Sequence, residues 1–252
     1  LALRNDGEVM TSDHNYLLLA NTERSKYYNY NNEYIDSLES TPQGRKLHDQ
    51  LITIGLEQYR KTGDNSAVPH KKGQIYVFKS LKDGITTVYD TYGLGEQGYY
   101  DEPITELEWT VGDSTKTILG YECIGAQTDY HGRHWTVWFA PEIPLHDGPW
   151  KLCGLPGLIL EAADSTGQHS FTATGIENSN QEMYPIYQSD RYDKMDRINM
   201  LKAYATYRKN SGAYSRALIM DTPDGTKIEM DAPRQQKDNT QKIDFLETDY
   251  HE

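Results

Sequence analysis

The sequence predicts an α+β protein whose strands are mostly antiparallel, with two inserted helices. Two observations predict this class: short β-prone runs recur along the chain between turns rich in Gly, Asp and Pro, and only two segments have helical periodicity. A parallel doubly wound sheet would require helices between most of its strands, and the sequence does not contain them. We therefore expect about eight or more strands in a single antiparallel-sheet domain that spans residues 1–252.

Hairpins account for the first half of the chain. One hairpin turns around Thr22 and Glu23, and a second turns at Lys82-Asp83-Gly84, where the glycine supplies a positive φ. The strands expected in this half are 15–20, 25–30, 74–79, 85–89 and 106–111.

The two expected helices have recognisable ends. Thr41 is a suitable N-cap with Pro42 as the first helical residue, and Gly63 ends the helix about five turns later. The second helix is capped by Ser189 or Asp190 and ends at Gly212.

The segment 119–140 predicts a hairpin whose register follows from a two-residue turn at His131-Gly132. Counting outward from this turn places Thr128 opposite Trp135 on an apolar face and Asp129 opposite His134 on a mixed face. The sheet should therefore have one face buried in the core and one face partly exposed to solvent.

The composition excludes several classes of partner. The net charge of −13 and the lack of a long basic stretch argue against nucleic acid and anionic membrane surfaces. No apolar run approaches the length of about 18 residues that would predict a membrane-spanning helix. Tyr outnumbers the other aromatic residues, with 20 Tyr against 4 Phe and 4 Trp, which suits half-wet sheet faces or pocket walls.

The first residue is Leu1 and not Met, which indicates either a secretory protein after leader removal or a chain trimmed at a domain edge. We expect the first of these, and therefore export from the cytoplasm. Cys123 and Cys153 fit either a disulfide or two buried thiols. After Asp231 the sequence is polar and mostly charged, so we expect a loosely held tail from about residue 232.

Gly154-Leu155-Pro156-Gly157-Leu158-Ile159 is the most distinctive motif. Pro156 biases the preceding residue to extended geometry, and the two glycines permit conformations that are closed to other residues. We expect a tight bend with a structural role, which delivers the apolar strand 158–163 into the sheet. The alternative is a backbone lip that lets a ligand approach closely.

This motif resembles the one that names the GLPGLI family of exported bacterial proteins. Further similarities are the Gly-Tyr-x-Cys strand that ends at Cys123, the Gly132-Arg133 pair, and Trp138-Phe139. The resemblance implies a periplasmic or secreted protein of unassigned function, and an outer-membrane transport receptor as a partner. The strand pattern is also similar to the periplasmic lipoprotein carriers, which implies a curved sheet or half-barrel around a hydrophobic pocket.

Catalytic motifs are missing from the sequence. It contains no Gly-x-Ser-x-Gly, His-Glu-x-x-His or Cys-x-x-Cys, and the Gly-rich stretch 93–98 lacks the Lys-Ser/Thr of a phosphate-binding loop. His131 and His134 lie near Asp129, but the hairpin register need not make them converge on a metal. We expect neither a metal nor a cofactor.

The sequence favours a non-catalytic cell-envelope protein that binds a hydrophobic molecule or a peptide on its sheet. Two alternatives remain open: a hydrolytic enzyme with a dispersed site, and an accessory interaction protein of an outer-membrane transporter. The residues expected to line the binding face are the aromatics Trp109, Trp138, Trp150 and Tyr121.

Overall fold

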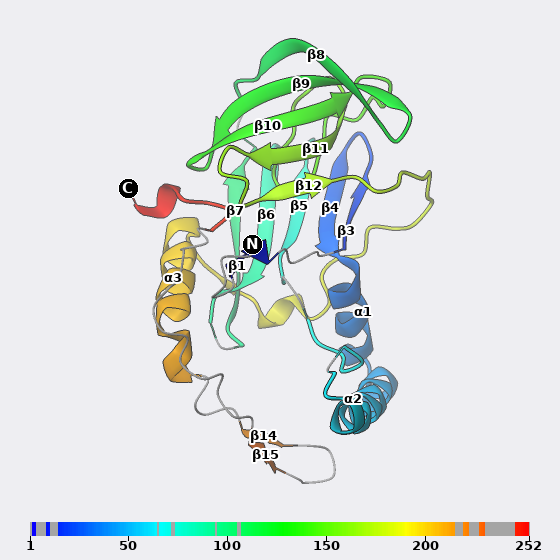
Figure 1. Ribbon diagram of the computed structural model, residues 1–252, viewed down its shortest axis with the longest axis vertical. Coiled ribbons are helices and arrows are strands. Elements are labelled where there is room, and N and C mark those ends of the chain that lie inside the picture. Colours follow the sequence, from blue (N-terminus) through cyan, green and yellow to red (C-terminus); the bar gives the residue numbers. More distant parts are fainter. Residues whose placement is uncertain are drawn as a thin grey trace.

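The structure is a computed structural model that describes residues 2–3, 9–10, 15–64, 66–71, 74–93, 95–104, 107–214, 219–221, 227–229 and 245–251. These residues form a six-stranded sheet, a five-stranded sheet, two small hairpins and three α-helices (Figure 1). Among the described strands, only β13 and β7 pair in parallel. The expected α+β class with mostly antiparallel strands is therefore confirmed.

The six-stranded sheet, called the first sheet below, is built mainly from the N-terminal hairpins. Its turns follow the sequence prediction, and Gly84 adopts a φ of 66° where the second hairpin reverses. Its strands, in spatial order, are β13 (Asp193–Lys194), β7 (Gln97–Pro103), β6 (Ile85–Thr91), β5 (Tyr76–Ser80), β4 (Arg24–Asn29) and β3 (Tyr16–Ala20).

The outer face of the first sheet carries a row of tyrosines. Tyr28, Tyr76, Tyr89 and Tyr99 pair in direct register across β4, β5, β6 and β7. The rings of Tyr89 and Tyr99 stack with centroids 5.1 Å apart, and Tyr192 meets Tyr89 edge-on at 5.2 Å. A row of aromatic cross-strand pairs thus stabilises this face.

The five-stranded sheet, called the second sheet, confirms the predicted hairpin register. Thr128 lies opposite Trp135 and Asp129 opposite His134. The turn residues His131 and Gly132 have φ values of 49° and 78°, as a two-residue turn between twisted strands requires. Its strands, in spatial order, are β12 (Ser170–Thr172), β11 (Leu158–Asp164), β10 (Arg133–Ala140), β9 (Tyr121–Tyr130) and β8 (Thr110–Ile118).

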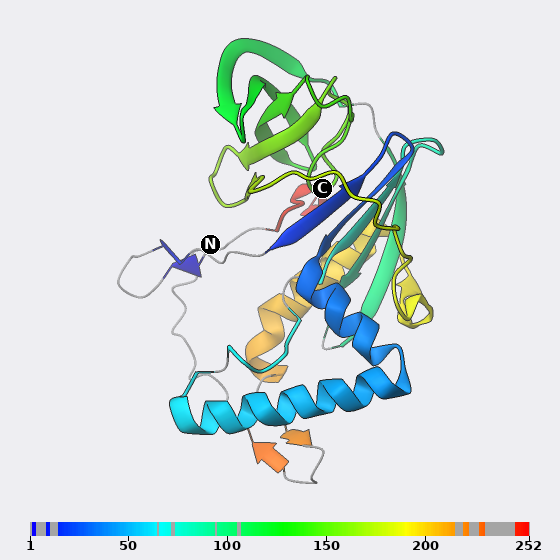
Figure 2. The same cartoon turned by 90° about the vertical axis from the view of Figure 1, so that its right-hand side faces the viewer.

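The main core lies between the two sheets, whose strands run crosswise (Figures 1 and 2). The strands do not form one curved sheet, because β7 ends at Pro103 and β8 pairs only with β9, so the chain begins a new sheet. Buried apolar residues meet there from both sheets and from the segment before β11: Tyr27, Val77, Val88, Tyr100, Ala126, Trp135, Val137, Phe139, Trp150, Leu152, Leu155, Ile159 and Ala162.

Two helices follow the first hairpin. Helix α2 (Pro42–Thr62) has the predicted ends: the Thr41 side chain accepts a hydrogen bond from the Gly44 N–H at 3.0 Å, and Gly63 is left-handed with a φ of 73°. Helix α1 (Tyr30–Glu39) was not predicted. It begins directly after β4, where the Asn29 side chain accepts a hydrogen bond from the Asn32 N–H.

The third helix, α3 (Arg197–Tyr214), begins later than the sequence predicted. The expected cap residues, Ser189 and Asp190, instead start a 3₁₀ turn, η1 (Ser189–Arg191). The chain then pairs briefly with β7 as β13, which postpones the helix. None of the described helices combines the length and apolar character needed to cross a lipid bilayer.

The predicted bend at residues 154–159 is present. Gly154 has a φ of 94°, and a Cβ on Gly157 would collide with the carbonyl group of Ala140. The bend delivers the buried Ile159 into β11, directly beside β10. The motif therefore forms a tight bend that leads into β11.

The C-terminal part of the chain differs from the expectation of a loose tail. Residues 230–244 lie outside the described residues. Residues 245–251, however, pack against the protein, and Glu247 and Tyr250 are 4% and 5% exposed. This segment includes a 3₁₀ turn, η3 (Asp249–His251). Two remote hairpins complete the described chain: β1 (Ala2–Leu3) with β2 (Val9–Met10), and β14 (Ile219–Asp221) with β15 (Lys227–Glu229).

Candidate functional site

The four aromatic residues expected to bind a ligand do not converge. Trp150 is fully buried in the core between the sheets, and Trp109 packs against that core while its Nε1 donates to the Cys153 carbonyl at 3.0 Å. Trp138 and Tyr121 belong to a separate cluster around Cys123. Two of these residues thus lie in one apolar cluster and two in another, and they do not line a common surface.

Both cysteines are buried and free, which matches the second of the two alternatives left by the sequence. Cys123 packs with Ala140 and Leu160. Burial raises the pKa of both thiols above the usual value, with Lys79 opposing this effect at Cys153. These are the properties of structural rather than reactive thiols.

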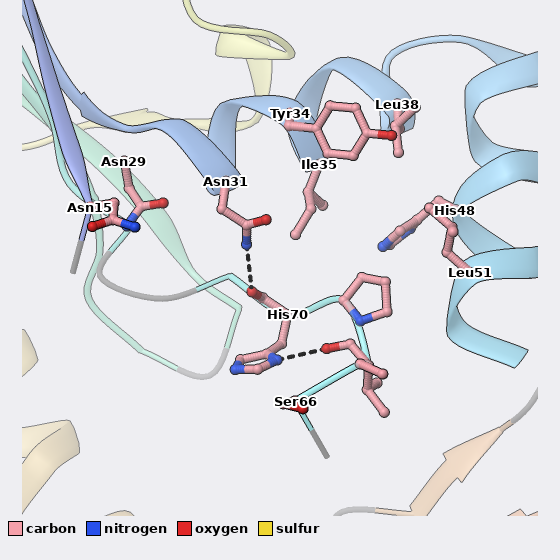
Figure 3. A pocket seen from close by; sticks show the side chains of 13 residues that line it. Asn15, Asn29, Asn31, Tyr34, Ile35, Leu38, His48, Leu51, Ser66 and His70 are labelled. Atoms are coloured by element: carbon pink, nitrogen blue, oxygen red, sulfur yellow. Dashed lines mark hydrogen bonds between the residues drawn. The ribbon is translucent and has the colours of Figure 1, made fainter. Parts of the chain in front are cut away.

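A pocket of about 410 Å³ lies where helix α1, helix α2 and the segment 66–70 meet (Figure 3). Its volume falls in the range of small-ligand sites, roughly 300–1,000 Å³. The described residues that line it include amide, imidazole and hydroxyl groups but no Asp, Glu, Lys or Arg. They are Asn15, Asn29, Asn31, Tyr34, Ile35, Leu38, His48, Leu51, Ser66, Ala67, Val68, Pro69 and His70.

His48 is the residue of α2 that brings an imidazole to this pocket. Its Nε2 is buried and has no hydrogen-bond partner among the described residues, and its imidazole points from α2 toward the centre of the pocket (Figure 3). Its Nδ1 lies 3.5 Å from Oε1 of Glu39, a carboxylate that also pairs with Lys71 at 3.1 Å. A neutral His48 with its proton on Nδ1, toward Glu39, would leave Nε2 as an acceptor facing the pocket.

The opposite wall of the pocket is held by hydrogen bonds. Asn31 Nδ2 donates to the His70 carbonyl oxygen at 3.2 Å, and His70 Nδ1 lies 2.7 Å from the Val68 carbonyl oxygen (Figure 3). Tyr34 is 46% exposed at the rim. The pocket thus combines apolar walls with a few fixed polar groups, which is the usual composition of a small-molecule site.

A second polar cluster lies between the two sheets at the tip of the β9–β10 hairpin. The Lys151 side chain has no exposed surface, and its Nζ forms ion pairs with Glu102 at 2.6 Å and Glu247 at 2.7 Å. These contacts are charge pairs without aligned hydrogen-bond geometry. The ionisable members of the cluster are Glu102, His131, Lys151, Arg197, Glu247 and Asp249.

The charges of this cluster compensate one another. Burial by itself raises the pKa of Glu247, but the neighbouring Lys151 and His131 charges hold it below its usual range. The pKa of Asp249 is lowered in the same way: burial raises it, but hydrogen bonds from Arg197 and His131 outweigh this effect. Three carboxylates face one lysine, one arginine and one histidine, so the cluster is neutral when His131 is protonated.

His131, Glu247 and Asp249 bring candidate metal-ligand atoms within 4.8 Å of one another. Arg197, however, already binds both carboxylates, at 2.6 Å to Glu247 and 2.7 Å to Asp249. A cation added here would compete with that guanidinium and with Lys151 for the same oxygens. This donor set therefore fits a metal ion poorly.

Comparison with known proteins gives a family match for part of the chain. Residues 101–203 match the family described as "N-glycanase peptide, N-terminal domain". This range runs from β7 through the second sheet into α3, and it contains Glu102, His131, Lys151 and Arg197. It does not contain the pocket residues. No curated protein matches the chain.

Two crystal structures of PNGF-II resemble the chain at 12% sequence identity. One, in space group C2, covers 78% of this chain and 30% of its own, with a TM-score of 0.49. The other, in space group P21, covers 80% and 32%, with a TM-score of 0.50. The chain thus spans about a third of the length of these relatives, and at this identity the likeness concerns the fold alone.

None of the pocket residues was among the candidate site residues of the sequence. Helix α2 was predicted, but His48 lies on a mostly exposed helix, where a single histidine carries no signal of its own. The unpredicted α1 supplies the facing wall. Because residues 30–39 are not among the helices expected from the sequence, the wall that they supply was not expected either.

Proposed function

We propose that this chain is a recognition domain of an N-glycan-processing hydrolase and that it binds a neutral saccharide in the pocket between α1 and α2. The observation that carries the proposal is the Nε2 of His48, a residue that lines the pocket: this buried atom has no hydrogen-bond partner among the described residues. A buried polar atom without a partner costs roughly 1–3 kcal/mol, so a ligand that donates to it regains that free energy.

The other pocket groups suit a hydroxyl-rich ligand. Asparagine side chains offer both donors and acceptors, and Tyr34 offers an exposed ring edge or face at the rim. The described lining residues include no Asp, Glu, Lys or Arg, which favours a neutral ligand over an anion or a cation. Ile35 and Leu38 supply apolar wall for ring carbons or a methyl group.

The family match supports a glycan over other neutral polar ligands, because the matching family is the N-terminal domain of an N-glycanase. The pocket lies outside the matched residues 101–203, so its role is argued from its own chemistry. The expected location in the cell envelope and the likeness to GLPGLI proteins remain predictions from the sequence.

A hydrolytic site within this chain is the second candidate. The family name favours it, and so does the contact between His131 Nδ1 and Asp249 Oδ2 at 3.0 Å. The chain's own carboxylates and cations, however, fill the space around His131. We therefore favour recognition over catalysis for this chain.

Titration with three probes tests the proposal: a peptide with one N-linked glycan, the same peptide without it, and free N,N′-diacetylchitobiose. We expect both glycan-containing probes to bind and the bare peptide not to bind. Asn31→Ala removes one polar group of the pocket and should weaken binding about 2- to 12-fold, the equivalent of about 0.5–1.5 kcal/mol. Gln127→Ala, on the exposed face of the second sheet, is the matched control.

A glycan-release assay separates the two candidate functions. The chain alone, incubated with the glycopeptide, should leave the glycan attached. Release that depends on His131 would establish the hydrolytic candidate instead. Equal binding of the glycosylated and bare peptides would contradict saccharide recognition.

A further inference from the structure

Residues 245–250 lie against the tip of the β9–β10 hairpin as a bound peptide would. Arg133 Nε donates to the carbonyl oxygens of Phe245 and Leu246 at 3.0 and 3.2 Å. The Thr248 N–H donates to the His131 carbonyl oxygen at 2.9 Å, and its hydroxyl donates to the Gly132 carbonyl oxygen at 3.0 Å. Groups of the hairpin therefore form hydrogen bonds with the main chain of the segment.

The two acidic side chains of the segment enter a group of cations. Glu247 accepts a hydrogen bond from Arg197 at 2.6 Å and from the Tyr100 hydroxyl at 3.0 Å, and it pairs with Lys151. Arg197 also binds both oxygens of Asp249, at 2.9 and 2.7 Å. This bidentate contact selects a carboxylate by its geometry as well as by its charge.

Aromatic contacts fix the ends of the segment. The Phe245 ring lies 4.9 Å from the Tyr204 ring on α3, and 5.6 Å from the ring of Tyr250. Leu246 packs against the main core. Main chain, charge and apolar side chains are thus all recognised within a few residues, which is the composition of a peptide-binding site.

The walls of this site come from parts of the chain far from the segment: β7, the β9–β10 turn, Lys151 and the first turn of α3. Without the segment, Lys151 and Arg197 would face Glu102 as the remaining carboxylate of the cluster. Arg133 would keep its contact with Asp164 at 2.6 Å. The empty site would therefore carry a net positive charge and attract an acidic segment.

We infer that Tyr100, His131, Arg133, Lys151 and Arg197 form a recognition site for a short acidic peptide, and that the chain's own residues 245–250 occupy it. The ligand class is an aromatic or aliphatic pair followed by Glu-x-Asp and a further aromatic residue, as in Phe245 to Tyr250. An acidic segment of another protein would bind only where it displaces the chain's own. This inference does not depend on the saccharide pocket.

The test uses the full chain with Glu247→Gln and Asp249→Asn combined. Hydrogen exchange should show faster exchange at residues 245–251 and 131–133 than in the wild type. A synthetic peptide with the sequence of residues 245–251 should then bind the double variant at least tenfold more tightly than it binds the wild type. The same peptide with Gln and Asn at its two acidic positions should not bind.

Continued protection of β4 and β5 in the same hydrogen-exchange experiment shows that the double variant is still folded, and a control variant tests the loss of a carboxylate elsewhere. Asp129→Asn removes a carboxylate from the exposed pair with His134 and should leave both exchange and peptide binding unchanged. The inference is overturned if residues 245–251 stay protected in the double variant. It is also overturned if they are released but the acidic peptide binds no better than its neutral counterpart.

Discussion

The carboxylate of Glu247 lies 2.7 Å from the ammonium group of Lys151, a side chain with no exposed surface. A residue in a polar C-terminal stretch thus reaches a cation buried between two sheets. Moving a lysine into such a site costs several kcal/mol unless carboxylates compensate its charge. The C-terminal segment is therefore part of what makes burial of Lys151 tolerable.

Glu247→Gln should lower the free energy of unfolding by about 3–5 kcal/mol, because it leaves the buried Lys151 and the partly buried Arg197 with fewer partners. Urea denaturation at neutral pH measures this change. Asp129→Asn, which removes an exposed ion pair, should change stability by about 0.5 kcal/mol or less. Similar losses for the two variants would show that the Glu247 contacts are not stabilising.

Gly132→Ala should destabilise the protein more than Gly120→Ala, although both glycines have a positive φ, of 78° and 87°. A Cβ at Gly120 would have no atom within 4 Å, so alanine there costs only backbone strain of about 1–2 kcal/mol. At Gly132 the new methyl group would also collide with the Thr248 hydroxyl and add about 1–3 kcal/mol.

Thermal unfolding of both variants and of Gly132→Ala combined with Thr248→Ala measures the two contributions. The double variant should recover part of the loss, because it removes the closest contact but leaves the backbone N of Asp249 3.0 Å from the new Cβ and leaves the strain. Equal melting temperatures for Gly132→Ala and Gly120→Ala would show that the C-terminal segment does not press on this turn.

The sequence predicted those parts of the fold that depend on neighbours along the chain. The register of the β9–β10 hairpin follows from two residues, His131 and Gly132, because a two-residue turn leaves a single way to pair the strands. The ends of α2 follow from Thr41 and Gly63. In each case the deciding contact lies within a few residues.

Features that depend on distant contacts were not predictable in the same way. Glu247 and Asp249 read as solvated tail residues, since nothing near them in the sequence shows that Lys151 and Arg197 will pair with them. The division of the strands into two facing sheets, likewise, arises from packing between residues far apart in the chain. Helix α1 depends on the cap at Asn29, which also ends a strand.

Asp90 predicts a pH dependence of stability. Burial raises the pKa of its carboxyl to about 7, with the Thr91 N–H opposing and the Glu247 charge adding to the effect. Between about pH 4 and 7 the folded protein keeps a proton that the unfolded chain has lost, so the free energy of unfolding falls as the pH rises.

Asp90→Asn removes this dependence. The variant should match the wild type near pH 4 and gain up to about 4 kcal/mol relative to it by pH 8. Urea denaturation across this range measures the difference in the free energy of unfolding between the two proteins. Carboxylates with lowered pKa values have the opposite pH dependence, but they are present in both proteins, so their effect cancels in this difference. A difference that does not change with pH would contradict the raised pKa.

The thiols of Cys123 and Cys153 should not react with a thiol reagent in the folded protein, because both are buried and burial raises their pKa. After unfolding in denaturant without reductant, both should react. Fewer than two reactive thiols per unfolded chain would show that the protein carries the disulfide in solution.

Nitrogen chemical shifts of the His48 imidazole, recorded while N,N′-diacetylchitobiose is added, test the central claim most directly. His48→Phe, which keeps the volume of the side chain but removes its acceptor, assigns the signal and should weaken binding. We predict that the chemical shift of Nε2 changes with the saccharide concentration, because this nitrogen accepts a hydrogen bond from the bound saccharide. Saccharide binding with an unchanged His48 signal, or no binding at all, would contradict recognition in this pocket.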